Sequence, residues 1–128
     1  GVFFEGELFD AHVLISKIIK SANQSIFLFD NYIDETVLTQ LSKKNKGVTV
    51  KIYIKNISRQ LQLDVEKFNT QYGSLQVIEF DKSHDRFLII DQTAIYHLGA
   101  SLKDLGKKWF AFSKLLIDPA LILGKLDS

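Results

Sequence analysis

One short segment of the sequence contains the residue types that phosphodiester chemistry requires. His84 and Arg86 lie two positions apart, at the start of an apolar run that ends at Asp91. Because side chains alternate along a strand, His84 and Arg86 are expected on the same face. A neutral imidazole can attack phosphorus and form a phosphohistidine, and a fixed guanidinium can neutralise the non-bridging oxygens in the transition state. A further group must protonate the leaving oxygen, and one strand cannot supply it.

Each of these residues also has a structural interpretation. A histidine at the end of a strand is commonly structural or exposed, and Arg86 could be a surface residue paired with Asp85 or Asp81. Asp91 precedes a predicted tight turn near residues 92 and 93, where an aspartate commonly caps the turn with its own carboxylate. The spacing of the three residues favours a phosphate site, and it favours this more strongly than it favours a working nucleophile.

Helices and strands on both sides of the segment must position it. Apolar residues repeat at helical spacing over residues 10–21, 34–42 and 58–72, which predicts three helices, the third capped by Ser58. Buried or alternating apolar runs predict strands over residues 25–29, 48–54, 75–80, 85–90, 94–98 and 109–117. A short last helix is expected with Asp118 as its cap and Pro119 at its first position.

The order of these elements predicts an α/β fold. Alternating helices and strands in the first half predict parallel pairing through crossovers, and the run of strands afterwards predicts an antiparallel extension. We expect a mixed, mainly central β-sheet flanked by helices on both faces. Strand 85–90 is apolar on both faces, with Leu88 and Ile90 on one and Phe87 and Ile89 on the other, so it should be central.

Composition restricts the classes of function. The 128 residues are enough for one domain. A net charge of +1 gives no global basic field, so any anion site must be local. The absence of cysteine excludes disulfides and thiolate zinc sites, and three histidines without a pair at ligand spacing predict no metal and no cofactor. No apolar run could span a bilayer and no signal peptide is visible, so we expect a cytoplasmic protein without membrane contact.

The segment resembles a variant of the phospholipase-D-type motif. That superfamily has the pattern His, any residue, Lys, four residues, Asp, followed by a Gly-Ser/Thr segment. Here His84 and Asp91 match, Arg86 stands in the lysine position, and Gly99-Ala100-Ser101 stands where the Gly-Ser segment belongs. The resemblance covers about residues 3–116. It implies a phospholipase-D-like fold, with His84, Arg86 and Asp91 as catalytic residues and chemistry that needs no metal.

The resemblance also implies a partner subunit. In the superfamily, two copies of the motif face each other across a two-fold axis, and a chain with one copy usually works as a homodimer. The missing acid would then be His84 of the partner subunit. Arginine in place of lysine keeps the charge and can grip phosphate with two parallel hydrogen bonds, but it is larger and planar.

The segment after the motif contains further candidates for phosphate and nucleic-acid contacts. Ser101 and Lys103 are predicted to bind phosphate together with Arg86, and Lys103 or Asp104 replaces the asparagine of the family pattern. The following basic cluster could form a rim that steers an anionic backbone and stacks a base, or it could be a solvated loop with one core tryptophan. This candidate rim consists of Lys107, Lys108 and Trp109.

Other polar residues are expected near the site on weaker grounds. Asp30 and Asn31 follow a buried strand, where α/β sheets often present ligand groups. His97 lies close to the Gly-Ser segment, although a structural role is the commoner case for such a histidine.

A second resemblance concerns domain organisation. Residues 97–112, together with Phe9-Asp10-Ala11 and Asp30-Asn31-Tyr32, are similar to the C-terminal region of bacterial proteins that begin with a phage-derived, antirepressor-type DNA-binding domain. The chain starts at Gly1 and contains no methionine. We therefore expect residues 1–128 to be one phospholipase-D-like domain cut from a longer protein, with a neighbouring N-terminal DNA-binding domain.

Two functions of different classes follow. The first is a metal-independent phosphodiesterase of nuclease type, acting as a homodimer on phosphodiesters and nucleic acid in particular. The second is a catalytically inactive dimerisation or DNA-binding module that binds a phosphate backbone through Arg86 and the lysines. The intact His84 and Asp91 favour the first, whereas Arg86 and the near-neutral charge favour the second. Lipid hydrolysis is disfavoured, because no amphipathic or aromatic membrane-facing surface is evident.

Overall fold

The computed structural model describes residues 2–3, 8–83, 85–104 and 110–127 of the chain. The elements within these ranges are β1 (Val2–Phe3), α1 (Leu8–Ser21), β2 (Ser25–Phe29), α2 (Glu35–Leu41), β3 (Thr49–Ile54), α3 (Arg59–Gln71), β4 (Leu75–Glu79), β5 (Arg86–Ile90), β6 (Ala94–Leu98), the 3-10 turn η1 (Leu102–Asp104), β7 (Phe110–Leu115), α4 (Ala120–Leu123) and the 3-10 turn η2 (Gly124–Asp127).

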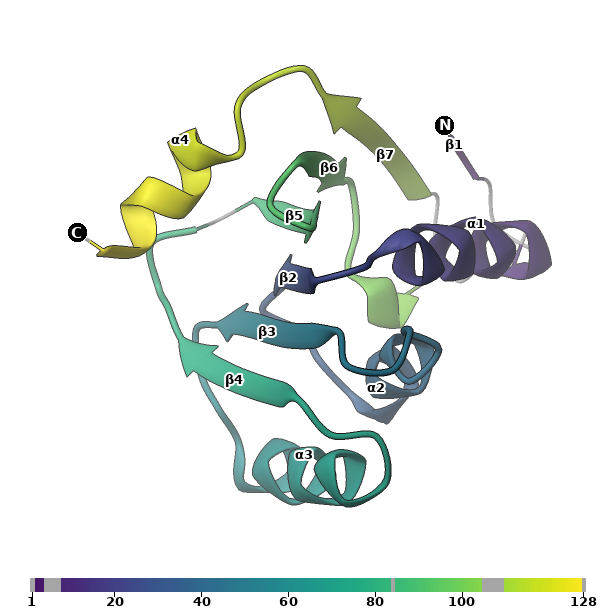
Figure 1. Ribbon diagram of the computed structural model, residues 1–128, viewed down its shortest axis with the longest axis vertical. Helices are drawn as coiled ribbons and strands as arrows, with labels where there is room; N and C mark the ends of the chain where they lie inside the picture. Colours follow the sequence, from purple (N-terminus) through teal and green to yellow (C-terminus); the bar gives the residue numbers. More distant parts are fainter. Residues whose placement is uncertain (1, 4–7, 84, 105–109, 128) are drawn as a thin grey trace.

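The strands form one mixed sheet in the order β1-β7-β6-β5-β2-β3-β4. β2, β3 and β4 pair in parallel. β5 joins β2 in antiparallel orientation, and β6 and β7 extend the sheet in the same antiparallel manner. β5 is therefore the central strand, as its apolar side chains on both faces predict (Figure 1).

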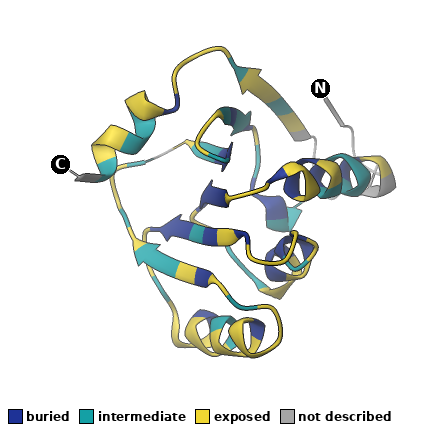
Figure 2. Ribbon diagram, viewed as in Figure 1, coloured by how far each residue is buried: buried dark blue, intermediate teal, exposed yellow. Residues whose placement is uncertain are grey.

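Two apolar cores lie on opposite faces of this sheet. The larger core packs α1, α2 and α3 against alternate residues of the strands, including Leu88 and Ile90. The smaller core contains Ile89 and a cluster of aromatic rings, with residues of α4 and η2 packed against it. Helices thus flank the sheet on both faces, and the buried residues concentrate in the central strands and the inward sides of α1 and α2 (Figure 2).

Local signals in the sequence explain where several elements begin and end. The Asp34 carboxylate caps α2 by accepting hydrogen bonds from the amides of Thr36 and Val37 at 3.0 and 3.3 Å. The Ser58 hydroxyl accepts from the Leu61 amide at 3.1 Å and so caps α3. Beyond α3, Gly73 has a φ of +74°, a conformation that glycine adopts without strain.

The predicted fold class is confirmed, and the differences are local. α1 begins at Leu8 instead of residue 10, and β7 ends at Leu115 instead of residue 117, because its register with β6 ends there. α4 begins at Ala120, whose amide donates to the Asp118 carboxylate at 3.0 Å, so Pro119 precedes the helix. The two-residue β1 and the turn η1 were not predicted.

No helix within the described ranges is long and apolar enough to cross a membrane.

Candidate phosphate-binding site

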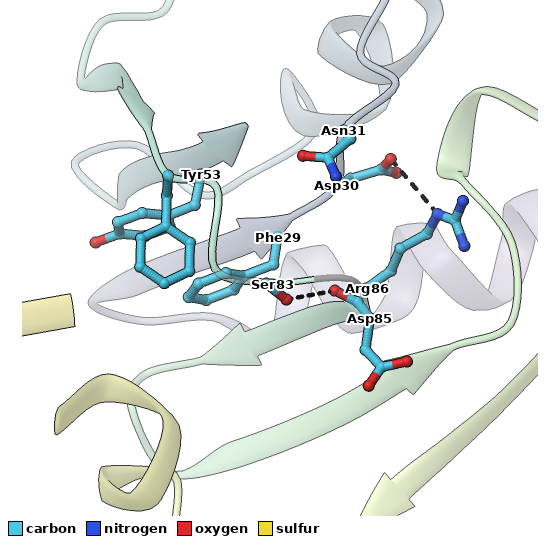
Figure 3. A pocket seen from close by; sticks show the side chains of 8 residues that line it. Phe29, Asp30, Asn31, Tyr53, Ser83, Asp85 and Arg86 are labelled. Carbon is cyan, nitrogen blue, oxygen red and sulfur yellow. Dashed lines mark hydrogen bonds and ion pairs between the residues drawn. The ribbon is translucent and has the colours of Figure 1, made fainter. Parts of the chain in front are cut away.

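Polar side chains gather at the edge of the sheet where β2 ends and β5 begins. β5 runs antiparallel to β2 with Phe87 opposite Phe29, so Arg86 and Asp30 meet at the same edge. Leu98, the last residue of β6, pairs with Arg86, and the Gly-Ser segment therefore leaves the sheet at this edge as well. Segments that are far apart in the sequence thus supply one cluster (Figure 3).

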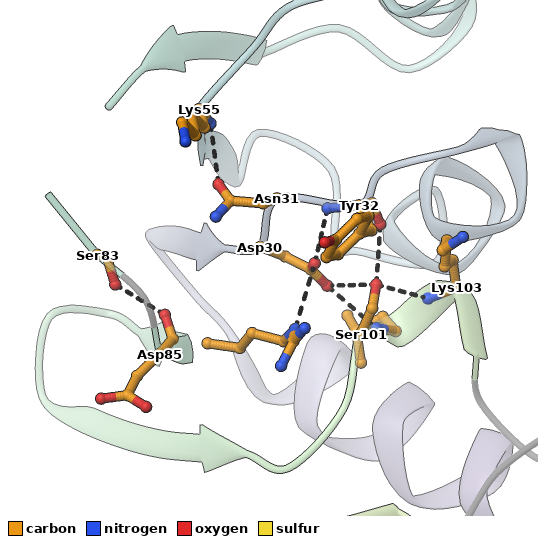
Figure 4. Close-up of polar contacts among 10 residues, drawn as sticks. Asp30, Asn31, Tyr32, Lys55, Ser83, Asp85, Ser101 and Lys103 are labelled. Carbon is orange, nitrogen blue, oxygen red and sulfur yellow. Dashed lines mark hydrogen bonds and ion pairs between the residues drawn. The ribbon is translucent and has the colours of Figure 1, made fainter. Parts of the chain in front are cut away.

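Asp30 is the buried centre of this cluster, with 2% of its surface exposed. Its Oδ1 accepts a hydrogen bond from the Tyr32 amide at 3.0 Å. Its Oδ2 accepts from the Leu102 amide at 3.1 Å and lies 2.9 Å from the Ser101 hydroxyl (Figure 4). Burial raises the pKa of Asp30, and these hydrogen bonds and the charge of Arg86 oppose the rise without cancelling it.

Arg86 projects from the start of β5 towards Asp30. Its Nε lies 3.8 Å from Asp30 Oδ1, and 29% of its side chain is exposed. Its guanidinium also lies over the ring of Tyr32, 5.7 Å from the centroid. The Nε atom is buried without a hydrogen-bond partner within the described residues. The guanidinium is thus placed by one buried carboxylate and one ring, and it remains partly open to solvent.

The suggested pairing of Arg86 with Asp85 or Asp81 is wrong, because the ion pair that forms is with Asp30. Asp85 precedes β5 and its carboxylate lies 3.5 Å from His97 Nε2. His97 also packs edge-on against Phe87, with ring centroids 5.5 Å apart. These contacts give His97 the structural surroundings that the sequence favoured.

Lys103 and Tyr32 extend the cluster outward. The Lys103 ammonium lies 5.5 Å from the centroid of the Tyr32 ring, and the ring belongs to a residue that is 54% exposed. Arg86 and Lys103 therefore place two cations beside one exposed aromatic ring. Two of the three residues predicted to bind phosphate are brought together here, and their binding of phosphate stays a prediction.

Ser101, the third of these residues, is buried, with 1% of its surface exposed. Its hydroxyl lies 2.8 Å from the Tyr32 carbonyl and 2.9 Å from Asp30 Oδ2. One hydroxyl has one proton to donate, so at any moment Ser101 donates either to Asp30 Oδ2 or to the Tyr32 carbonyl. The contacts of Ser101 are with the protein, and its contact with phosphate stays a prediction.

Asp91 lies at the opposite end of β5 from Arg86. Its carboxylate accepts hydrogen bonds from the backbone amides of Asn23, Gln24 and Ser25, at 3.0, 2.6 and 3.0 Å to Oδ1. Burial acts to raise the pKa of Asp91, but these three bonds outweigh it and lower the pKa. The carboxylate thus joins the β5–β6 turn to the segment before β2 instead of capping its own turn. A catalytic role for Asp91 remains a prediction.

Four predicted site residues, His84, Lys107, Lys108 and Trp109, lie outside the described residues. The neighbours of His84 are described, and the Ser83 hydroxyl donates to the Asp85 carbonyl at 2.7 Å. A small hollow opens beside them at the sheet edge (Figure 3). It is lined by Phe29, Asp30, Asn31, Tyr53, Phe80, Ser83, Asp85 and Arg86.

Within the described ranges, no group of three His, Asp or Glu side chains could hold a metal ion.

Sequence reasoning did not identify the contributions of Asp30 and Tyr32. Asp30 was a candidate only because it follows a buried strand, and Tyr32 entered only through a resemblance. The signal for both is the polar run that directly follows β2, in which the side-chain Oδ1 of Asn31 also accepts a hydrogen bond from the backbone amide of Lys55 at 2.9 Å (Figure 4).

The fold is shared with several solved structures. NucT from Helicobacter pylori superimposes with a TM-score of 0.65 at 16% identity, over 99% of this chain and 90% of that one. TrmBL2, described as an archaeal chromatin protein with a novel mode of DNA binding, gives 0.58 at 17% identity, over 99% of this chain and 49% of that one. Polyphosphate kinase from Porphyromonas gingivalis gives 0.58 at 15% identity, over 98% of this chain and 21% of that one. No protein-family model and no curated protein matches the sequence.

These likenesses confirm the phospholipase-D-like fold that the sequence predicts. At such low identity they establish the fold alone. The motif variant and the resemblance to antirepressor-type proteins remain predictions.

Proposed function

We propose that this edge of the sheet binds the phosphate of a phosphodiester and that a homodimer of the chain cleaves it without a metal. The observation that supports this most directly is the placement of Arg86. Its Nε lies beside the buried Asp30, and its guanidinium is partly exposed, with Lys103 next to the same Tyr32 ring. Two cations at a rigid edge are suited to the non-bridging oxygens of a phosphodiester.

The proposed chemistry has two steps. An imidazole nitrogen of His84 attacks phosphorus, the bond from phosphorus to the leaving oxygen breaks, and that oxygen takes a proton from His84 of the partner subunit. Water then attacks the phosphohistidine, giving its proton to the same partner imidazole, and the bond between phosphorus and nitrogen breaks. Arg86 and Lys103 neutralise the phosphoryl oxygens in both steps.

Nucleic acid is the proposed substrate. A phosphodiester backbone offers the anion that the two cations require. The chromatin protein with a similar fold binds DNA, according to its description, which supports this substrate class for a chain of the same architecture.

The alternative function is a catalytically inactive module that dimerises or binds DNA in a longer DNA-binding protein. Arginine in the lysine position of the motif favours it, because a planar guanidinium binds phosphate well but can displace phosphorus from the attacking imidazole. The DNA binding described for TrmBL2 is a second observation in its favour.

Cleavage assays in a chelator separate these functions. Hydrolysis of bis(p-nitrophenyl) phosphate and of labelled DNA is measured with excess EDTA for the unmodified chain, His84→Ala and the control His12→Ala, whose histidine lies on α1. We expect activity that His84→Ala abolishes and His12→Ala retains, from a protein that sediments as a dimer.

The other outcomes are equally informative. Activity that survives in His84→Ala, or a strictly monomeric protein, would contradict the proposed chemistry. A dimer with no cleavage, whose salt-sensitive DNA affinity falls in Arg86→Ala, would establish the module instead. Absence of cleavage, DNA binding and dimerisation together would refute both functions.

A further inference from the structure

Tyr32 combines a fixed backbone with an exposed ring. Its amide donates to Asp30 at 3.0 Å, and its carbonyl lies 2.8 Å from the hydroxyl of Ser101. Both partners are buried, with 2% and 1% of their surfaces exposed, whereas Tyr32 itself is 54% exposed. The ring is therefore presented to solvent from a rigid support.

The ring lies within reach of any ligand that the two cations bind. Arg86 and Lys103 lie 5.7 and 5.5 Å from its centroid. In a nucleotide, only the sugar separates the base from its phosphate. A phosphate bound by these cations therefore places an attached base close to the Tyr32 ring.

We propose that the site takes single-stranded nucleic acid, with an unpaired base stacked on Tyr32 while the adjoining phosphate binds Arg86 and Lys103. This inference rests on the proposed phosphate site and names its substrate class. Every base has a flat aromatic face, so stacking on tyrosine is tolerant of sequence. In a duplex the faces of the bases are already stacked on their neighbours, so a duplex can offer only its phosphates to this site.

A second role for the ring must be separated from stacking. Tyr32 attracts both cations through the negative face of its ring, so removing the ring could also shift Arg86 and Lys103. That effect would weaken every phosphate ligand equally. Stacking would weaken only ligands that have bases.

The test compares two strands of equal length and charge. Fluorescence anisotropy measures the affinity for labelled oligothymidine and for an abasic strand with the same phosphates, in a His84→Ala background that prevents cleavage. Each base stacked on an aromatic ring contributes about 5- to 150-fold in affinity. We expect the parent protein to prefer oligothymidine by a factor in this range, and to bind the corresponding duplex more weakly than the single strand.

Three variants complete the test. Tyr32→Ala should abolish the preference for oligothymidine and leave the affinity for the abasic strand within about 2-fold of the parent's. Tyr32→Phe should keep the preference for oligothymidine, because the ring remains. Tyr72→Ala is the matched control, since that tyrosine is also exposed but lies at the end of α3.

The possible failures give different results. Equal affinity of the parent protein for the two strands would overturn the stacking role and leave the phosphate site intact. Absence of binding to either strand would refute the phosphate site, and the stacking role with it. Equal weakening of both strands in Tyr32→Ala would show that the ring only positions the cations, and it would overturn the inference.

Discussion

Replacing Asp91 by asparagine should destabilise the fold without affecting the sheet edge that contains Arg86. Asp91 has a φ of +54°, a conformation that asparagine tolerates at least as well as aspartate. The substitution therefore removes the charge while it keeps the backbone and the size of the side chain. Asp91→Ala also removes the side-chain oxygen that accepts hydrogen bonds, and it adds backbone strain at this φ.

The hydrogen bonds of Asp91 set the size of the effect. All three donors, the amides of Asn23, Gln24 and Ser25, lie within 3.0 Å of Oδ1, and an asparagine oxygen can occupy that position. Charge assistance adds about 0.5 kcal/mol or more to each such bond where solvent has access. We expect Asp91→Asn to lower the free energy of unfolding by about 1–2 kcal/mol. Asp91→Ala should lower it by about 3–4 kcal/mol, because the alanine variant also loses the three hydrogen bonds and strains the turn.

The effect should depend on pH in one direction. The folded-state pKa of Asp91 is lower than its ordinary value of 3.8, so its stabilisation is fully present above that value and is lost as the pH falls through the folded-state pKa. Asparagine does not titrate. The difference in free energy of unfolding between the two proteins should therefore be constant above about pH 5 and should narrow below about pH 4.

Urea unfolding at several pH values measures these differences. The control is Asp81→Asn on an exposed loop, which should change the free energy of unfolding by less than about 0.5 kcal/mol. This account would be refuted if the Asp91→Asn protein were as stable as the parent at pH 7. It would also be refuted if the difference in free energy of unfolding between the two proteins did not narrow in acid. Loss of phosphate binding in folded Asp91→Asn would show that Asp91 acts at the site as well.

Three further predictions concern the sheet edge. Arg86→Ala leaves the buried Asp30 without its cation, so the pKa of Asp30 should rise further. Thermal melts should then show the stability of the variant, relative to the parent, falling as the pH rises above 3.8. A loss of stability that does not depend on pH would contradict this prediction. Lys103→Ala should reduce the slope of log affinity against log salt by about 1, and an unchanged slope would exclude a phosphate contact. Gly99→Ala should cost about 1–3 kcal/mol in urea unfolding, because its Cβ would lie 2.9 Å from a backbone oxygen of β7. Gly124→Ala, which meets open space, is the control and should cost nothing.

The sequence predicted those parts of the structure that depend on local pattern. Alternation along β5 assigned Leu88 and Ile90 to one core and Phe87 and Ile89 to the other, and the two cores contain them in that arrangement. Apolar residues on both faces predicted the central position of β5. Such features follow from the period of a strand and need no knowledge of distant residues.

The contacts that build the site could not be predicted in this way. Ser101 and Asp30 are 71 positions apart and meet only because β5 pairs with β2 on one side and β6 on the other. The partner of Arg86 was missed for the same reason, since sequence proximity suggested the aspartates beside it. Capping of its own turn was one interpretation of Asp91, but its carboxylate reaches amides in a segment 66 to 68 positions earlier.

The burial of Asp30 gives arginine a structural advantage at position 86. A lysine has one charged group, which would have to lie either beside the buried carboxylate or out at the sheet edge. A guanidinium has donors at both Nε and its two terminal nitrogens. Nε lies 3.8 Å from Asp30 Oδ1, and the proposed phosphate contact would use the terminal nitrogens. Arg86 is therefore matched by a buried acid that directly follows the neighbouring strand β2. Position 86 keeps a fixed cation at the edge of the sheet, which both proposed functions require.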